Sequence, residues 1–309
     1  MRHFIDLASA GRVGLRAILD EAHRRKTARA GRPKGALDPD ALLAGHVLAM
    51  IFDKPSTRTR FSFDLAMRQL GGTTIVTSAG DMQLGRGETI ADTAHVLSRF
   101  VDCVMIRCAA HATIEELGTV AMVPVINGLT DLTHPCQAMA DMMTVEERLG
   151  RPVAETCWAW VGDGNNMAHS LIEAASVMGF ELRLGVPHGY DPDTGVVATA
   201  AARGGTVDVM HSPLAAVDGA DVVATDTWVS MGQAVPRDKL AAMAKFQVTA
   251  QLMAAAAPHA VFLHCLPVHR GEEVTADVID GPQSAVWDEA ENRLHIQKAI
   301  LLWCLGQIG

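Results

Sequence analysis

Short apolar runs recur along this chain and alternate with longer stretches of helical periodicity. The hydrophobicity within each run is continuous, which suits strands that are buried on both faces of a parallel sheet. Nine runs are therefore expected to be strands: 47–52, 73–77, 103–106, 122–126, 157–161, 181–186, 206–210, 222–225 and 260–264. Strands that alternate with helices predict an α/β fold with doubly wound parallel sheets.

The length of 309 residues is comfortable for two such domains. A helical stretch begins at Pro135 and ends before Gly150-Arg151-Pro152, so we place a boundary at its start. The predicted domains are residues 1–135 and 136–288, with a C-terminal helix, 289–309, that packs back on the first. Ligands of open α/β sheets bind beyond the carboxyl ends of the strands, which predicts an active site in the cleft between the two domains.

The composition of the chain argues against two kinds of partner, nucleic acids and membranes. The formal net charge of −9 argues against nucleic acid. Six cysteines form no CxxC pair, no apolar run reaches membrane-spanning length, and the N-terminus lacks a signal-peptide core. We expect a cytoplasmic protein with no membrane role. Residues 11–30 are predicted to be a surface helix, with 23–26 (His-Arg-Arg-Lys) on its solvated face.

The stretch Ser56-Thr57-Arg58-Thr59-Arg60 lies where the first strand passes into a helix, after Pro55. Hydroxyls that can cap the helix, free backbone N–H groups and two guanidiniums crowd one turn, which predicts a phosphate site. The alternative is an ordinary N-cap followed by solvated arginines. That alternative explains Ser56 or Thr57 but not the whole turn.

Further polar residues follow the third and fourth strands of the first half. Arg107 comes directly after the run 103–106, and a polar loop after 122–126 leads to His134 and Gln137 at the start of a helix. This start is a second donor-rich helix N-terminus. Taken alone, each of these residues is more often structural than functional.

The second half begins with a strand followed by Gly162-Asp163-Gly164-Asn165-Asn166, a pattern that invites a dinucleotide interpretation. Met167 occupies the third glycine position, and no acidic residue ends the run 181–186, so the fingerprint is incomplete. Two asparagines at a helix start suit a small zwitterion better. Asp226, at the end of a later strand, is a suitable partner for an ammonium group, although a simple turn or cap remains the alternative.

The last strand ends in His264-Cys265-Leu266-Pro267. A structural zinc held by His264, Cys265 and His269 lacks a fourth ligand at normal spacing. A cysteine nucleophile lacks an assignable base. The bond between Leu266 and Pro267 is a candidate for the cis form, which aims the Leu266 carbonyl inward.

Five segments in this order resemble the aspartate and ornithine carbamoyltransferase family, in its ornithine branch: 55–60 (Pro-Ser-Thr-Arg-Thr-Arg), 134–137 (His-Pro-Cys-Gln), 162–167 (Gly-Asp-Gly-Asn-Asn-Met), 230–232 (Ser-Met-Gly) and 264–267 (His-Cys-Leu-Pro). The resemblance covers nearly the whole chain. It implies transfer of the carbamoyl group of carbamoyl phosphate to the δ-amine of L-ornithine, giving L-citrulline and phosphate for arginine biosynthesis. It implies no metal and no organic cofactor, and a homotrimer in which Gln83 reaches a neighbouring subunit's site.

The resemblance also implies site residues. Carbamoyl phosphate is expected to contact Ser56, Thr57, Arg58, Thr59, Gln83, Arg107, His134, Pro135, Cys136, Gln137, Cys265, Leu266 and Arg293. Ornithine is expected to contact Asn166, Asp226, Ser230 and Met231. The residues implied in catalysis are Arg58, Arg107, His134, Asp226 and Cys265.

Three alternatives stay open: a carbamoyltransferase for another amine such as putrescine or N-acetylornithine, a non-catalytic regulatory homologue, and a nicotinamide oxidoreductase. Two departures from the family pattern are minor. Asp53 stands where Glu is common, and the loop around Arg237 and Asp238 is short.

Overall fold

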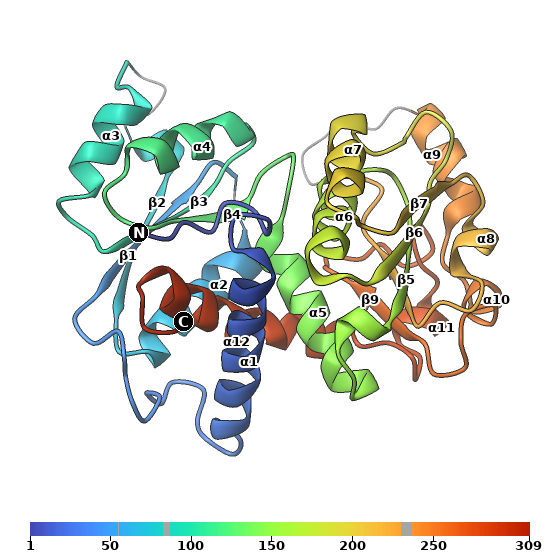
Figure 1. The fold of residues 1–309 in the computed structure, drawn as a ribbon, viewed down its shortest axis with the longest axis horizontal. Helices are drawn as coiled ribbons and strands as arrows, with labels where there is room; N and C mark the ends of the chain where they lie inside the picture. The colour runs from blue at the N-terminus through green and yellow to red at the C-terminus, as the bar shows by residue number, and fades with distance from the viewer. Residues whose placement is uncertain (55, 83–86, 230–236) are drawn as a thin grey trace. The chain divides into compact units, whose positions relative to one another are not determined.

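The computed structural model describes residues 1–54, 56–82, 87–229 and 237–309. The chain divides into two compact units (Figure 1). Unit 1 comprises Met1–Met139 and Arg293–Gly309, and unit 2 comprises Ala140–Asn292. The divisions fall within two long helices, α5 (Pro135–Leu149) and α12 (Val286–Cys304). None of the helices in the described ranges is long and apolar enough to cross a membrane.

Unit 1 is built on a four-stranded parallel sheet in the order β2-β1-β3-β4. Its strands are β1 (Val47–Phe52), β2 (Thr73–Ser78), β3 (Cys103–Arg107) and β4 (Val125–Leu129). Its helical segments, beside the parts of α5 and α12, are α1 (Gly11–Ala28), α2 (Thr57–Gln69), η1 (Ala79–Asp81), α3 (Ile90–Leu97) and α4 (His111–Val120). Parallel strands joined by helices confirm the expected α/β class for this unit.

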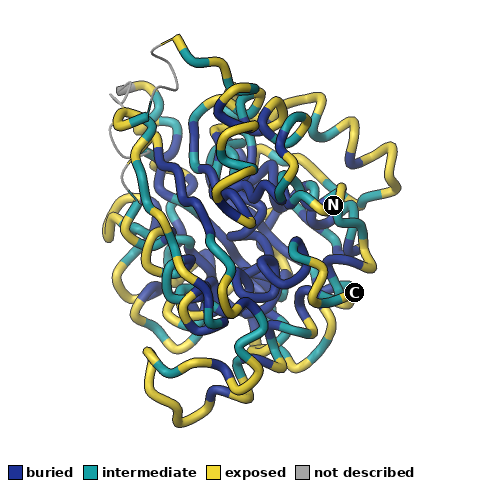
Figure 2. Tube along the Cα trace, turned by 90° about the vertical axis from the view of Figure 1, so that its left-hand side faces the viewer, coloured by how far each residue is buried: buried dark blue, intermediate teal, exposed yellow. Residues whose placement is uncertain are grey.

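Successive side chains of the unit 1 strands point to opposite faces of the sheet, because the strand period is two residues. Ile51 and Val104 pack with Ala94 of α3 and Leu117 of α4 on one face. On α1, a Cβ added at Gly14 would lie 3.2 Å from the Trp303 side chain of α12, so glycine permits this close approach. In Figure 2 the buried stretches (dark blue) lie on the inside of the trace, and the exposed residues (yellow) lie mainly at its periphery.

Unit 2 is built on a five-stranded parallel sheet in the order β7-β6-β5-β8-β9. Its strands are β5 (Cys157–Val161), β6 (Glu181–Gly185), β7 (Val207–Met210), β8 (Val222–Thr225) and β9 (Val261–His264). Its helical segments, beside the parts of α5 and α12, are η2 (Val153–Glu155), α6 (Asn166–Met178), α7 (Thr194–Ala202), α8 (Pro213–Val217), α9 (Arg237–Met243), η3 (Ala244–Phe246), α10 (Ala250–Met253) and α11 (Ala276–Ile279). This arrangement is again doubly wound.

The strand orders locate one topological switch point in each sheet. In unit 1 the connections leave β1 in one direction, toward β2, and then cross to β3 on its other side. In unit 2 they run from β5 to β7 and then cross back to β8. The carboxyl ends of β1 and β3, and those of β5 and β8, are therefore where ligands are expected.

Two expectations were wrong in detail. The strand expected at 122–126 is β4, Val125–Leu129. Pro124 cannot donate to a ladder and Met122 is exposed, so the strand begins after both. It also includes Gly128, where a Cβ would lie 2.4 Å from the sulfur of Met105. The other error concerns residues 23–26, because the Arg25 side chain of α1 is buried in an ion-pair network.

Candidate functional site

The first cluster of predicted residues lies at the N-terminus of α2, beyond β1. Ser56 occupies the N-cap with an extended backbone, although its side chain makes no capping hydrogen bond. Thr57 and Arg58 lie in the first turn, which contains no acidic residue. The N–H groups and the positive end of the helix dipole at this turn favour an anion.

Thr59 is fully buried and connects two other elements to this helix end. Its Oγ1 accepts a hydrogen bond from Arg293 Nη2 of α12 at 2.9 Å and one from Arg107 Nη1 of β3 at 3.4 Å. Arg107 ends β3, next to β1 at the switch point of this sheet. Three elements, α2, β3 and α12, thus contribute guanidiniums to one helix N-terminus. This arrangement suits a phosphate group.

His134 lies directly before α5 and is buried. Burial lowers the pKa of its imidazole well below the ordinary value. Three guanidiniums act in the same direction, those of Arg293, Arg107 and Arg58. His134 is therefore neutral at physiological pH, which suits a hydrogen-bonding group and not an acid with imidazolium charge.

The first turn of α5 holds the remaining predicted residues of this cluster. Pro135 begins the helix as expected. Cys136 Sγ donates to the Asn127 carbonyl at 3.3 Å, and burial raises the pKa of this thiol to about 12. Gln137 is fully buried beside it. The thiol of Cys136 thus links α5 to β4.

The second cluster lies at the switch point of the unit 2 sheet. Asp226 follows β8, and its Oδ1 accepts from the backbone N–H of Thr227 at 2.7 Å and from Cys265 Sγ at 3.0 Å. Its Oδ2 accepts from Asn165 Nδ2 at 3.3 Å. Each of these hydrogen-bond donors is neutral. Within the described ranges, the hydrogen-bond partners of Asp226 therefore supply no cation to balance a carboxylate at this position.

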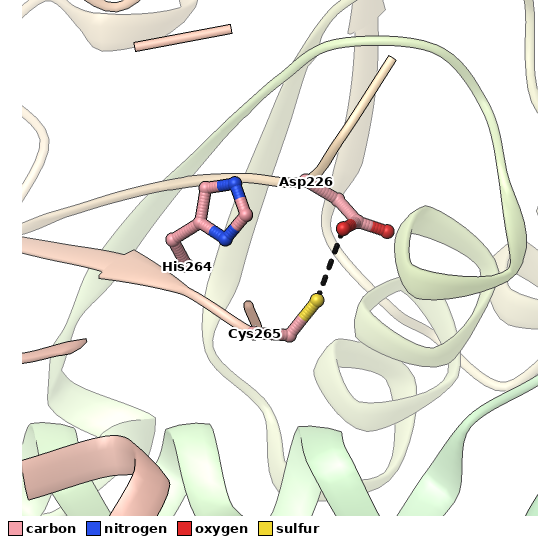
Figure 3. A group of neighbouring side chains, drawn as sticks. All are labelled: Asp226, His264 and Cys265. Carbon is pink, nitrogen blue, oxygen red and sulfur yellow. Dashed lines mark hydrogen bonds between the residues drawn. The ribbon is translucent and has the colours of Figure 1, made fainter. Parts of the chain in front are cut away.

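Cys265 is directed at the Asp226 carboxylate in Figure 3. Desolvation raises the pKa of the Cys265 thiol well above its ordinary value. Carboxylates act in the same direction, those of Asp226, Glu289 and Asp141. The thiol stays protonated at neutral pH and donates to Asp226, which argues against a thiolate nucleophile.

His264 adjoins this pair (Figure 3), and one potential ligand atom from each of Asp226, His264 and Cys265 lies within 4.8 Å of the others. The imidazole is nevertheless committed to hydrogen bonds. Its Nδ1 accepts from the Leu266 N–H at 2.9 Å, which leaves Nε2 to donate to Glu273 Oε1 at 3.2 Å. With both nitrogens engaged, His264 has no free lone pair for a zinc ion in this arrangement, so the group does not fit a zinc site.

The glycine turn after β5 is filled by the chain itself. A Cβ added at Gly164 would lie 2.1 Å from the backbone nitrogen of Pro192, and the Gly164 N–H donates to the Tyr190 carbonyl at 2.7 Å. In a dinucleotide fold, the corresponding glycine lets the backbone approach the pyrophosphate. Here it lets residues 190–192 approach instead, which argues against a nicotinamide cofactor at this turn.

Two family models together match most of the chain. Residues 2–147 match the carbamoyl-P binding domain of aspartate/ornithine carbamoyltransferase, and residues 154–304 match its Asp/Orn binding domain. The chain belongs to the aspartate/ornithine carbamoyltransferase family. The expected resemblance is thereby confirmed.

Individual members of this carbamoyltransferase family are similar over their full length. The ornithine carbamoyltransferase of Rhizorhabdus wittichii is 65% identical over 308 residues, which cover 100% of this chain and 99% of the relative. The solved ornithine carbamoyltransferase of Pyrococcus furiosus is 47% identical with a TM-score of 0.92, covering 100% of this chain and 98% of that one. The solved anabolic enzyme of Campylobacter jejuni is 34% identical with a TM-score of 0.91, covering 99% and 100%.

The other residues that the carbamoyltransferase motifs implied fall partly outside the described ranges. Gln83, Ser230 and Met231 lie outside the described residues. Asn166 is the first residue of α6. The Leu266–Pro267 bond is cis, as expected from the sequence, and Leu266 has a φ of 57°.

Sequence reasoning missed the observed contacts of three residues near Asp226. Asn165 caps α6 by accepting from the N–H groups of Met167 and Ala168, and it donates to Asp226. An asparagine directly before a helix is a cap signal that pointed to this role. Asp163 and Lys239 form an ion pair at 2.6 Å. No local pattern marked that pair, because 76 residues separate its members.

Proposed function

We propose that this protein is an ornithine carbamoyltransferase, which transfers the carbamoyl group of carbamoyl phosphate to the δ-amine of L-ornithine and forms L-citrulline and phosphate. The observation that carries the proposal is Asp226, a carboxylate at the switch point of unit 2 held by neutral donors. Such a carboxylate suits the ammonium of an amino acid. The family assignment and the ornithine-acting relatives support the same acceptor.

Each substrate is assigned to one part of the chain. Residues 1–135, with the C-terminal helix 289–309, are proposed to bind carbamoyl phosphate, and residues 136–288 to bind ornithine. The phosphate is assigned to Ser56, Thr57, Arg58, Thr59 and Arg107. Further contacts with carbamoyl phosphate are assigned to Gln83, His134, Pro135, Cys136, Gln137, Cys265, Leu266 and Arg293. Ornithine is assigned to Asn166, Asp226, Ser230 and Met231.

The reaction requires a nucleophilic amine and a stabilised oxyanion. The δ-nitrogen, unprotonated, forms a bond to the carbamoyl carbon, and the bond between that carbon and the phosphate oxygen breaks. The proton lost from the nitrogen passes to the leaving phosphate or to solvent. Arg107 and neutral His134 donate hydrogen bonds to the carbonyl oxygen as it gains charge. No covalent enzyme intermediate is needed, which agrees with a protonated Cys265.

A comparison of acceptors tests this function directly. The carbamoylated product, which is citrulline for ornithine, is measured from carbamoyl phosphate with ornithine, putrescine, N-acetylornithine and aspartate side by side. We expect strong turnover with ornithine alone. Preference for putrescine or N-acetylornithine would reassign the acceptor. Binding of a phosphate analogue without turnover of any acceptor would indicate a regulatory homologue.

Replacing Asp226 with asparagine is expected to reduce kcat/KM for ornithine by about 100- to 1,000-fold, because a charged hydrogen bond to the ammonium is lost. The KM for carbamoyl phosphate should change by less than about threefold. Steady-state kinetics with each substrate varied separately measures both effects. Asp208→Asn, at an exposed position of β7, is the matched control. An ornithine effect no larger than that of the control contradicts the assignment.

A homotrimer with shared active sites is proposed from the family resemblance. Two apolar side chains of unit 1 support an interface between copies: Phe61 on α2 and Ile75 on the edge strand β2 are 72% and 55% exposed. Light scattering should give three chains per particle.

Mixing two inactive variants tests whether Gln83 acts on a neighbouring site. After joint unfolding and refolding of Gln83→Ala with Arg107→Ala, about a quarter of the sites should combine intact residues and recover activity. A mixture that stays as inactive as its components contradicts sharing. A cytoplasmic location and a role in arginine biosynthesis complete the proposal; the anabolic Campylobacter relative is consistent with that direction.

A further inference from the structure

Asp163 and Lys239 form an ion pair beside the Asp226 cluster. Lys239 Nζ lies 2.6 Å from Asp163 Oδ2, and the side chains expose 21% and 15% of their surface. Asp163 lies in the turn that follows β5, and Lys239 lies on α9. Both side chains are thus largely shielded from solvent. Charges in such an environment interact more strongly than in water.

The turn that carries Asp163 is fixed and connected to Asp226. The Asp163 carbonyl accepts from Trp160 Nε1 at 3.0 Å and from the Asn165 N–H at 2.9 Å. Asn165 in turn donates its side-chain N–H to Asp226 at 3.3 Å. Asp163 and Asp226 thus lie at the carboxyl ends of the neighbouring strands β5 and β8, and Asn165 connects the Asp163 turn to Asp226.

The charges of this group interact. Burial raises the pKa of Asp163, and the negative charge of Asp226 acts in the same direction, while the Lys239 ammonium opposes both. Cys265, which contacts Asp226, also faces the carboxylates of Glu289 and Asp141. His264 is held by Glu273 and the Leu266 N–H. The described contacts of Asp163 and Asp226 thus give one cation, Lys239, and it pairs with Asp163.

We propose that the Asp163–Lys239 pair sets the charge of the ornithine site, so that bound ornithine places one ammonium against Asp226 and keeps its δ-amine neutral. The inference rests on the proposed function and deepens it. Neither residue contacts the substrate in this account; both act through the electrostatic field. Without Lys239, a second uncompensated carboxylate would favour the protonated δ-ammonium, which cannot attack the carbamoyl carbon.

The test compares two single variants whose predicted effects have opposite signs. A unit charge about 10 Å from the amine, at an effective dielectric constant of about 20–40, shifts its titration by about 0.6–1.2 pH units. Lys239→Met should move the acidic limb of the kcat–pH profile to higher pH by that amount. Asp163→Asn, which leaves the Lys239 charge unpaired, should move it to lower pH. The double variant should return to within about 0.2 pH unit of the wild type.

Controls separate this role from a structural one. Lys239→Arg keeps the charge and should keep the wild-type limb, and Lys245→Met removes an exposed lysine nearby in sequence and should do the same. A purely structural role would lower kcat or raise KM at every pH without moving the limb. Should Lys239→Met fail to fold, the sign of the Asp163→Asn shift decides alone.

Two outcomes overturn the inference by different routes. An active wild type whose single variants show no shift, or shifts of the same sign, overturns the charge-setting role and leaves the proposed function in place. A wild type that makes no citrulline from ornithine overturns the proposed function and this inference with it.

Discussion

Replacing Arg107 with methionine is expected to lower kcat/KM for carbamoyl phosphate by about 1,000-fold. Arg107 ends β3 at the switch point of unit 1 and donates to Thr59, so its guanidinium is directed at the N-terminus of α2. There it would bind the phosphate and the developing oxyanion together, a combination worth several kcal/mol in a desolvated site. Initial rates with carbamoyl phosphate varied at saturating ornithine measure the loss.

A surface arginine provides the control for this variant. Arg99→Met removes an exposed guanidinium that donates to the His95 carbonyl of the preceding helix and should leave the kinetics unchanged. Arg107→Lys keeps the charge but loses the two-pronged geometry, so an intermediate loss is expected. If Arg107→Met stays within about threefold of the wild type and folds normally, Arg107 does not act in the phosphate site.

The positions of the strands were predictable from the sequence because both faces of each central strand are buried. Continuous apolar runs therefore marked β1, β5 and β8 at their observed bounds. The order of the strands was not predictable, since it depends on which face each connecting helix covers. The switch points that hold Arg107 and Asp226 became evident only from the two observed strand orders.

The candidate site residues were found where several functional residue types crowd one turn. The segment 56–60 and the segment 134–137 are of this kind, and the structure places both at helix N-termini. Partnerships between distant residues left no local trace. Arg293, which contacts Thr59 across 234 residues, entered the predicted site only through the family resemblance. The Asp163–Lys239 pair was missed altogether.

The ion-pair network around Arg25 was also not predictable from the local sequence. In the sequence, 23–26 has the composition of a solvated helix face, yet Arg25 contacts Glu21, Asp38 and Asp40 and is 2% exposed. Nothing near residue 25 indicates that Lys298, on the last helix, also donates to Asp38. Burial of a basic residue depends on such remote partners.

Replacing Asp38 with asparagine is expected to lower the free energy of unfolding by about 3–5 kcal/mol. Asp38 is buried and accepts from Arg29 at 2.6 Å, Arg25 at 2.8 Å and Lys298 at 3.0 Å. Its removal leaves several buried cations with less than their balancing charge. Lys298→Met is the contrasting variant: Asp38 keeps two guanidiniums, so the change should stay within about 1 kcal/mol. Urea unfolding followed by circular dichroism measures both.

The stability difference between the wild type and Asp38→Asn should depend on pH through the titration of Asp38. Burial alone would raise the pKa of Asp38, but hydrogen bonds from Arg29 and Lys298 outweigh it and hold the pKa below the ordinary 3.8. The stabilisation is therefore complete above that value and is lost as the pH falls through the lower folded-state pKa. Between about pH 5 and pH 7 the gap between wild type and Asp38→Asn should be constant, and below about pH 4 it should narrow. A gap that instead widens in acid would mean that Asp38 is protonated in the native network.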